Sequence, residues 1–163
     1  MSYLRFAGMI AVSTVIMFGL MYVNTFSVDH IFYSQTRMWM ALLMGAVMAI
    51  IMLGFMWDMY KNKRANFAIM LIAFLAFAGP LWLVRSQNTV ADLSYMEAMI
   101  PHHSIAVLTS ERAHIRDPRV RKLADGIIET QVREIGEMKS LIADLLAKPL
   151  TRDARDLPPR PAE

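Results

Sequence analysis

Three long apolar runs fill the first half of the chain and decide its class. They cover about residues 6–26, 38–60 and 66–84. Each has close to the roughly 20 residues that a helix needs to cross a bilayer. Hydrophobic residues make up 56 % of the whole chain, against about 45–50 % in an ordinary soluble domain. We therefore predict a transmembrane domain of three helices over residues 1–85.

The short loops between these runs predict an orientation. The loop after the second run carries Lys61, Lys63 and Arg64 and no acidic residue, whereas the loop over residues 24–37 carries one arginine and one aspartate. Basic loops stay in the cytoplasm. We therefore expect a protein of the bacterial inner (plasma) membrane with a cytoplasmic N-terminus. An odd number of crossings then leaves the C-terminal domain periplasmic or extracellular.

The second apolar run has two parallel bands. Met40, Met44, Met48, Met52 and Met56 recur at every fourth residue, beside a band formed by Ala41, Gly45 and Ala49. Small residues let transmembrane helices approach closely, so the second band predicts a packing face. The methionines are either adaptable apolar filler or a thioether track for a soft metal, and we favour filler.

After residue 85 the sequence turns polar and predicts an extracytoplasmic helical hairpin over residues 86–147. Asp92 or Ser94 is expected to cap a first helix that runs to about residue 116, with Glu97 completing a capping box. Asp117 followed by Pro118 predicts the start of the second helix, which ends near residue 147. Pro101 is expected to kink the first helix. We expect the Pro-rich, charged tail at 148–163 to be flexible.

Periodic apolar positions predict how the two helices face each other. The expected contact residues are Met96, Met99, His103, Ala106, Ser110 and Ala113 on the first helix, and Ile127, Gln131, Glu134, Met138, Leu141 and Leu145 on the second. A hairpin of this size has too little core to stand alone. We therefore expect two hairpins to pair into a four-helix bundle, which makes the protein a homodimer.

Soft metal ligands gather in this hairpin. Met99 lies three residues before His102 and four before His103, so one helix turn separates it from both imidazoles. There is no cysteine in the chain. Thioether and imidazole donors without thiolate suit copper, above all Cu(I). We predict Met99, His102 and His103 as the main ligands. Further candidate ligands are Met96, Met138 and Glu134.

These residues also resemble a known family. MIPHHSIAVL, followed by DPRVRKLADGIIETQVREIGEMKSLI, is similar to the bacterial family called domain of unknown function 305. The resemblance implies a ferritin-like, copper-binding periplasmic bundle, here fused to three N-terminal transmembrane helices. The matching positions are Asp92, Met96, Met99, His102, His103, Gln131, Glu134, Ile135 and Met138. The family's Gln after the histidine pair is Ser104 here, and its later Met is Leu108.

The expected function is copper sequestration, tolerance or hand-off to a copper donor or acceptor protein. The alternative is a small membrane interaction subunit whose hairpin docks a partner without metal. We do not expect an enzyme. Ferritin-type di-iron sites need a Glu-x-x-His pair on each of two helices, and the pair that this hairpin offers, Glu111 with His114, lies near the expected end of its first helix. The formal charge of +3 belongs to the apolar half, so we expect no nucleic-acid partner.

Overall fold

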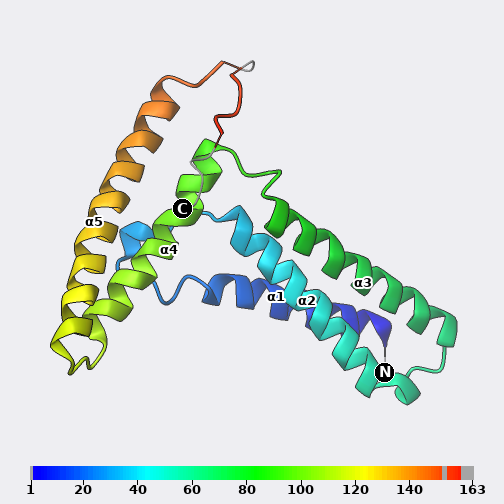
Figure 1. Ribbon diagram of the computed structural model, residues 1–163. Helices are drawn as coiled ribbons and strands as arrows, with labels where there is room; N and C mark the ends of the chain where they lie inside the picture. Colours follow the sequence, from blue (N-terminus) through cyan, green and yellow to red (C-terminus); the bar gives the residue numbers. More distant parts are fainter. Residues whose placement is uncertain (1, 152–153, 159–163) are drawn as a thin grey trace.

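The chain folds into helices throughout the part that the computed structural model describes, residues 2–151 and 154–158. The elements in order are α1 (Tyr3–Leu20), η1 (Val28–His30), α2 (Gln35–Phe55), η2 (Trp57–Met59), α3 (Lys63–Ser86), α4 (Asp92–Arg112) and α5 (Pro118–Ala147). The two η elements are short 3-10 turns. No strand occurs in these described ranges. The predicted all-α class is confirmed (Figure 1).

Helices α1, α2 and α3 form an N-terminal bundle in which α2 contacts both neighbours. Its core contains Phe6, Leu53 and Tyr60. The predicted band of small residues is a packing face: Gly45 is buried, and a Cβ added there would lie 2.3 Å from Thr14 Oγ1 of α1. The methionines of the neighbouring band are all half-buried.

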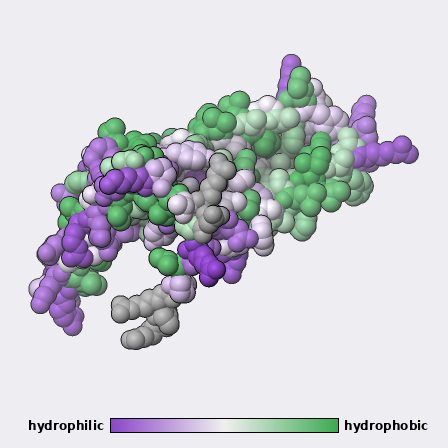
Figure 2. All heavy atoms as spheres, turned by 90° about the horizontal axis from the view of Figure 1, so that it is seen from above, coloured by the Kyte–Doolittle hydropathy of each residue, from purple (hydrophilic) through white to green (hydrophobic). Residues whose placement is uncertain are grey.

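All three of these helices are long and apolar enough to cross a membrane. They begin three residues earlier than the apolar runs predicted, because polar residues cap their N-termini. Ser34 Oγ accepts a hydrogen bond from the Arg37 amide at the start of α2, and Asn62 Oδ1 accepts one from the Ala65 amide at α3. In Figure 2 hydrophobic residues gather at the end of the molecule formed by the bundle, and hydrophilic ones at the other.

Helices α4 and α5 lie antiparallel and form the predicted hairpin. Asp117 caps α5 as predicted. The predicted capping box is wrong, because Ala91 has the extended backbone of the N-cap and places Ser94 inside the first turn. Helix α4 also ends at Arg112 rather than near residue 116, because Ala113 turns to an extended backbone. The helix runs without interruption through Pro101.

A third segment packs against the two helices of the hairpin, and the sequence did not predict it. The connecting loop between α1 and α2, residues 21–34, contains η1, which contacts α4. Residues of the tail that are described, 148–151 and 154–158, form no helix or strand. The remaining tail positions lie outside the described residues, so the expected flexibility of 148–163 stays a prediction.

Candidate functional site

His103 and Glu134 face each other across the hairpin. His103 Nδ1 lies 3.2 Å from Glu134 Oε2, with the imidazole side chain 13 % exposed and the carboxylate side chain 37 % exposed. Gln131 Nε2, one turn earlier on α5, donates a weak 3.4 Å hydrogen bond to the same carboxylate oxygen. The pairing brings together two of the predicted metal ligands across the contact between α4 and α5.

The imidazole of His103 keeps an unused nitrogen. Its Nδ1 atom is buried and forms no aligned hydrogen bond, although the Glu134 oxygen is within reach. Burial is the main cause that lowers the pKa of His103. The carboxylate of Glu134 raises this pKa and the neighbouring His102 lowers it, and the net direction is downward. The ring is therefore neutral near pH 7. Because a carboxylate faces Nδ1, the proton belongs on Nδ1 and the lone pair on Nε2.

Two thioethers occupy the next layer of the hairpin. Met99 precedes His103 by one turn on α4, and Met138 follows Glu134 by one turn on α5. Because the helices are antiparallel, these two turns lie beside each other, and Met99 packs against the apolar cluster that contains Met138. Met96 belongs to the same cluster and is 6 % exposed. Five predicted ligands thus lie along one contact between α4 and α5: Met96, Met99, His103, Glu134 and Met138.

His102 does not join this group. It is exposed, and its ring centroid lies 6.0 Å from that of His103. Adjacent helical residues point about 100° apart, which explains the divergence. Within residues 2–151 and 154–158, no three histidine, aspartate or glutamate side chains converge on one point. Any metal held here would therefore depend on the methionine sulfurs.

The most buried positions of α4 differ from those expected. Ile100 and Ser104 are 0 % exposed, whereas the predicted contact residues Met99 and His103 are half-buried. The reason is the connecting loop: Phe32 packs against the apolar cluster of the hairpin, and Ser104 is hydrogen-bonded to the Phe26 amide and to His30 Nδ1. Ile100 and Ser104 are therefore covered by α5 on one side and by the connecting loop on the other. Only the departure of Ser104 from the family's glutamine could have singled it out.

Unpartnered buried atoms also occur elsewhere among the described residues. They are Gln35 Oε1, Trp39 Nε1 and Tyr60 Oη. Gln35 and Trp39 lie in α2, and Tyr60 lies between η2 and α3. An amide oxygen, an indole N–H and a phenol are poor ligands for a soft metal. His103 is the member of this set that places an imidazole, a metal-ligating group, beside thioethers.

Fold and site together define a helical hairpin attached to a bundle of three apolar helices. Residues 83–156 match the family described as Domain of unknown function (DUF305). A relative, "Uncharacterized protein L153" of Acanthamoeba polyphaga mimivirus, is 32 % identical over 102 residues, which span 58 % of this chain and 67 % of that protein. No solved structure matches the chain. The chain belongs to the DUF305 family, as its hairpin predicted.

Proposed function

We propose that this protein is a membrane-anchored, extracytoplasmic binder of a soft metal ion, most of all Cu(I). Its role would be to sequester copper, confer tolerance, or hand the ion to a donor or acceptor protein. It would hold and release the ion without catalysing a reaction. The observation that carries the proposal is the neutral imidazole of His103, which faces Glu134 through Nδ1 and lies beside a layer of methionines.

The donor set fits a soft ion. A neutral imidazole and two thioethers, from His103, Met99 and Met138, are ligands that Cu(I) accepts readily. Glu134 faces the Nδ1 side of the His103 ring. A carboxylate in that place typically orients a ligating histidine and fixes which nitrogen binds the metal. We assign Glu134 this positioning role, while Met96 and His102 would contribute little.

The proposed topology follows from the same contacts. The connecting loop touches the hairpin, so loop and hairpin belong on one side of the membrane, and the basic loop at residues 61–64 belongs on the other. We place the hairpin outside the cytoplasm of a bacterial cell, because basic loops remain inside. An alkaline phosphatase fusion after Ala147 should be active; a fusion active only as a cytoplasmic reporter would contradict this topology.

A Cu(I) competition titration on the detergent-purified full chain tests the proposal. The chain has 15 methionines, so matched variants are needed to separate the site from background binding. Met99→Leu should weaken Cu(I) binding about 10-fold or more, because it removes a thioether at constant volume. Met96→Leu and Met44→Leu should change it less than about twofold. Equal losses in all three variants would overturn the proposal, as would no binding at micromolar copper.

A second candidate function is an interaction subunit that needs no metal. A shallow groove of about 590 Å³ lies along α5, and it is lined in part by Leu123, Gly126 and Ile127. Leu123 is 65 % exposed, which suits the docking of a partner helix. A second copy of the hairpin placed there would give the proposed homodimeric four-helix bundle. If His102→Ala with His103→Ala retains partner binding and the wild type binds no copper, this second function is the correct one.

A further inference from the structure

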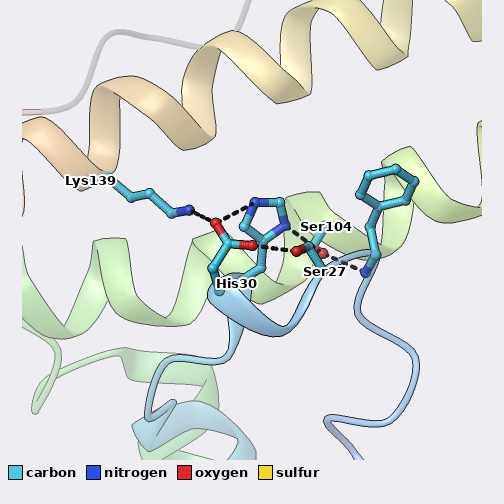
Figure 3. A network of polar contacts seen from close by, with 6 residues as sticks. Ser27, His30, Ser104 and Lys139 are labelled. Carbon is cyan, nitrogen blue, oxygen red and sulfur yellow. Dashed lines mark hydrogen bonds and ion pairs between the residues drawn. The ribbon is translucent and has the colours of Figure 1, made fainter.

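The connecting loop reaches the hairpin through three polar contacts (Figure 3). The Phe26 amide donates a 2.7 Å hydrogen bond to Ser104 Oγ on α4. His30 Nδ1 lies 3.0 Å from the same oxygen. On α5, the ammonium group of Lys139 pairs with the carboxylate of Asp29, which also accepts a hydrogen bond from the hydroxyl of Ser27. The loop therefore contacts both helices of the hairpin at once.

Apolar packing adds to these contacts. Phe32, near the end of the loop, packs against the cluster formed by Met96, Ile100, Ile135, Met138 and Ile142. Two helices alone bury too little surface for independent stability. The loop therefore supplies a third layer from within the same chain, and it covers the side of the hairpin that carries Ser104.

We propose that residues 26–32 form a pH-sensitive clasp, which holds the hairpin on the N-terminal bundle while His30 is neutral and releases it when His30 is protonated. The proposal goes beyond metal binding and does not depend on it. Release would expose the Ile100 and Ser104 face of α4 and loosen the layer in which Met96 and Met138 lie.

The hydrogen-bond pattern around Ser104 gives the reason. Its oxygen already accepts from the Phe26 amide, so its own hydroxyl hydrogen is free to donate to His30 Nδ1. That bond needs the lone pair of a neutral imidazole. Protonation converts His30 Nδ1 from an acceptor into a donor. The Ser104 oxygen then faces two N–H donors, and the Ser104 hydroxyl hydrogen loses Nδ1 as its acceptor. Ser104 is fully buried, so water cannot replace the lost partner cheaply.

The charges that face His30 oppose one another, and the balance favours the neutral ring. Burial lowers the pKa of His30 most, the ammonium group of Lys139 lowers it further, and the carboxylate of Asp29, 3.8 Å from Nε2, raises it. The net direction is downward. A lowered pKa in the clasped state means that the clasp is most stable above the pKa of a free histidine, about 6.5, and weakens as pH falls below that value.

The ion pair titrates in a separate range. Hydrogen bonds from Lys139 and Ser27 lower the pKa of Asp29 to about 2. In the clasp the carboxylate therefore stays charged well below pH 4. Its contribution to the clasp begins to fall only near the pKa of an ordinary aspartate, about 4. A change in the clasp between about pH 7.5 and about pH 5 reports on His30 and not on Asp29.

Amide hydrogen exchange of the full chain in detergent measures opening directly. The Phe26 amide reports on the clasp, and the Val23 amide, bonded locally to the Leu20 carbonyl, is the internal control. After correction for intrinsic exchange, we expect the protection of Phe26 to fall about threefold or more from pH 7.5 to pH 5. His30→Gln, which accepts a hydrogen bond but does not titrate, should abolish this fall. An equal fall in His30→Gln, or none in the wild type, would overturn the proposal.

Zero-length carbodiimide cross-linking provides an independent check that the clasp forms. It joins a carboxylate to an amine in contact, so it should link Asp29 to Lys139, with the pair of Lys63 and Asp58, 3.6 Å apart on η2 and α3, as internal reference. At neutral pH the Asp29–Lys139 product should be at least as abundant as the reference. Its absence would show that the loop does not lie on the hairpin, and would overturn the clasp whatever the exchange data show.

Discussion

Asn66 in the N-terminal bundle is fully buried, and His103 in the hairpin is half-buried with a buried Nδ1 atom, yet their polar atoms are used differently. Asn66 Oδ1 accepts a 2.8 Å bond from the Tyr3 hydroxyl, and Nδ2 donates to the carbonyls of Tyr60 and Trp57. His103 Nδ1 faces a carboxylate without an aligned bond. A buried group with its hydrogen bonds made serves the fold, whereas a neutral imidazole that keeps a lone pair beside thioethers suggests a ligand. The comparison therefore assigns Asn66 to the stability of the fold and His103 to the binding of a ligand.

The largest effect should follow from His103→Leu. It removes the imidazole donor but keeps an apolar side chain in the contact between α4 and α5. We expect Cu(I) affinity to fall about 100-fold, or about 2.7 kcal/mol. The stability of the hairpin should change by less than about 1 kcal/mol, because no aligned hydrogen bond is lost and Glu134 remains partly solvated. Competition titration and thermal unfolding of one preparation measure both. Large destabilisation with unchanged copper binding would reverse the assignment.

Asn66→Leu should give the opposite pattern. Leucine has a similar volume, but the buried carbonyl of Tyr60 would lose its partner, and the Tyr3 hydroxyl and the Trp57 carbonyl would each lose one of two. We expect a loss of about 2 kcal/mol in the free energy of unfolding and no measurable change in copper affinity. Denaturation in mild detergent, followed by the fluorescence of the tryptophans, measures the loss. Asn66→Leu should also leave the clasp intact, so unchanged protection of the Phe26 amide is the control.

Periodicity and capping residues predicted much of this architecture. Three apolar helices and a hairpin begun by Asp117 and Pro118 follow from local rules. The sequence also placed Met99, His103, Glu134 and Met138 on facing surfaces, because their spacing repeats every three or four residues. What it could not predict was the loop. The contacts of Phe26 and His30 with Ser104 join residues more than 70 positions apart, and no local pattern encodes such a pairing.

That missing element explains why the expected contact surface on α4 was only partly right. Periodicity identifies the face toward α5, but burial is greatest where two neighbours overlap, at Ile100 and Ser104. The helix end near residue 112 was missed for a simpler reason: reversal of the chain before Asp117 requires several residues outside both helices. The end of a helix and the contacts of a connecting loop both depend on tertiary packing, which the identity of a single residue does not reveal.

Glu134→Gln tests whether the carboxylate of Glu134 orients the His103 imidazole, and it has the smallest expected effect of the three substitutions. Glutamine keeps the size and the hydrogen-bonding oxygen, but it removes the charge that faces His103. If Glu134 orients the imidazole, Cu(I) affinity should fall about 10-fold, in the range found when a second-shell partner is lost. Glu137→Gln, an exposed neighbour on the same helix, is the matched control and should have no effect. A loss as large as that of His103→Leu would make Glu134 a direct ligand, and no loss would leave the orientation of His103 to packing alone.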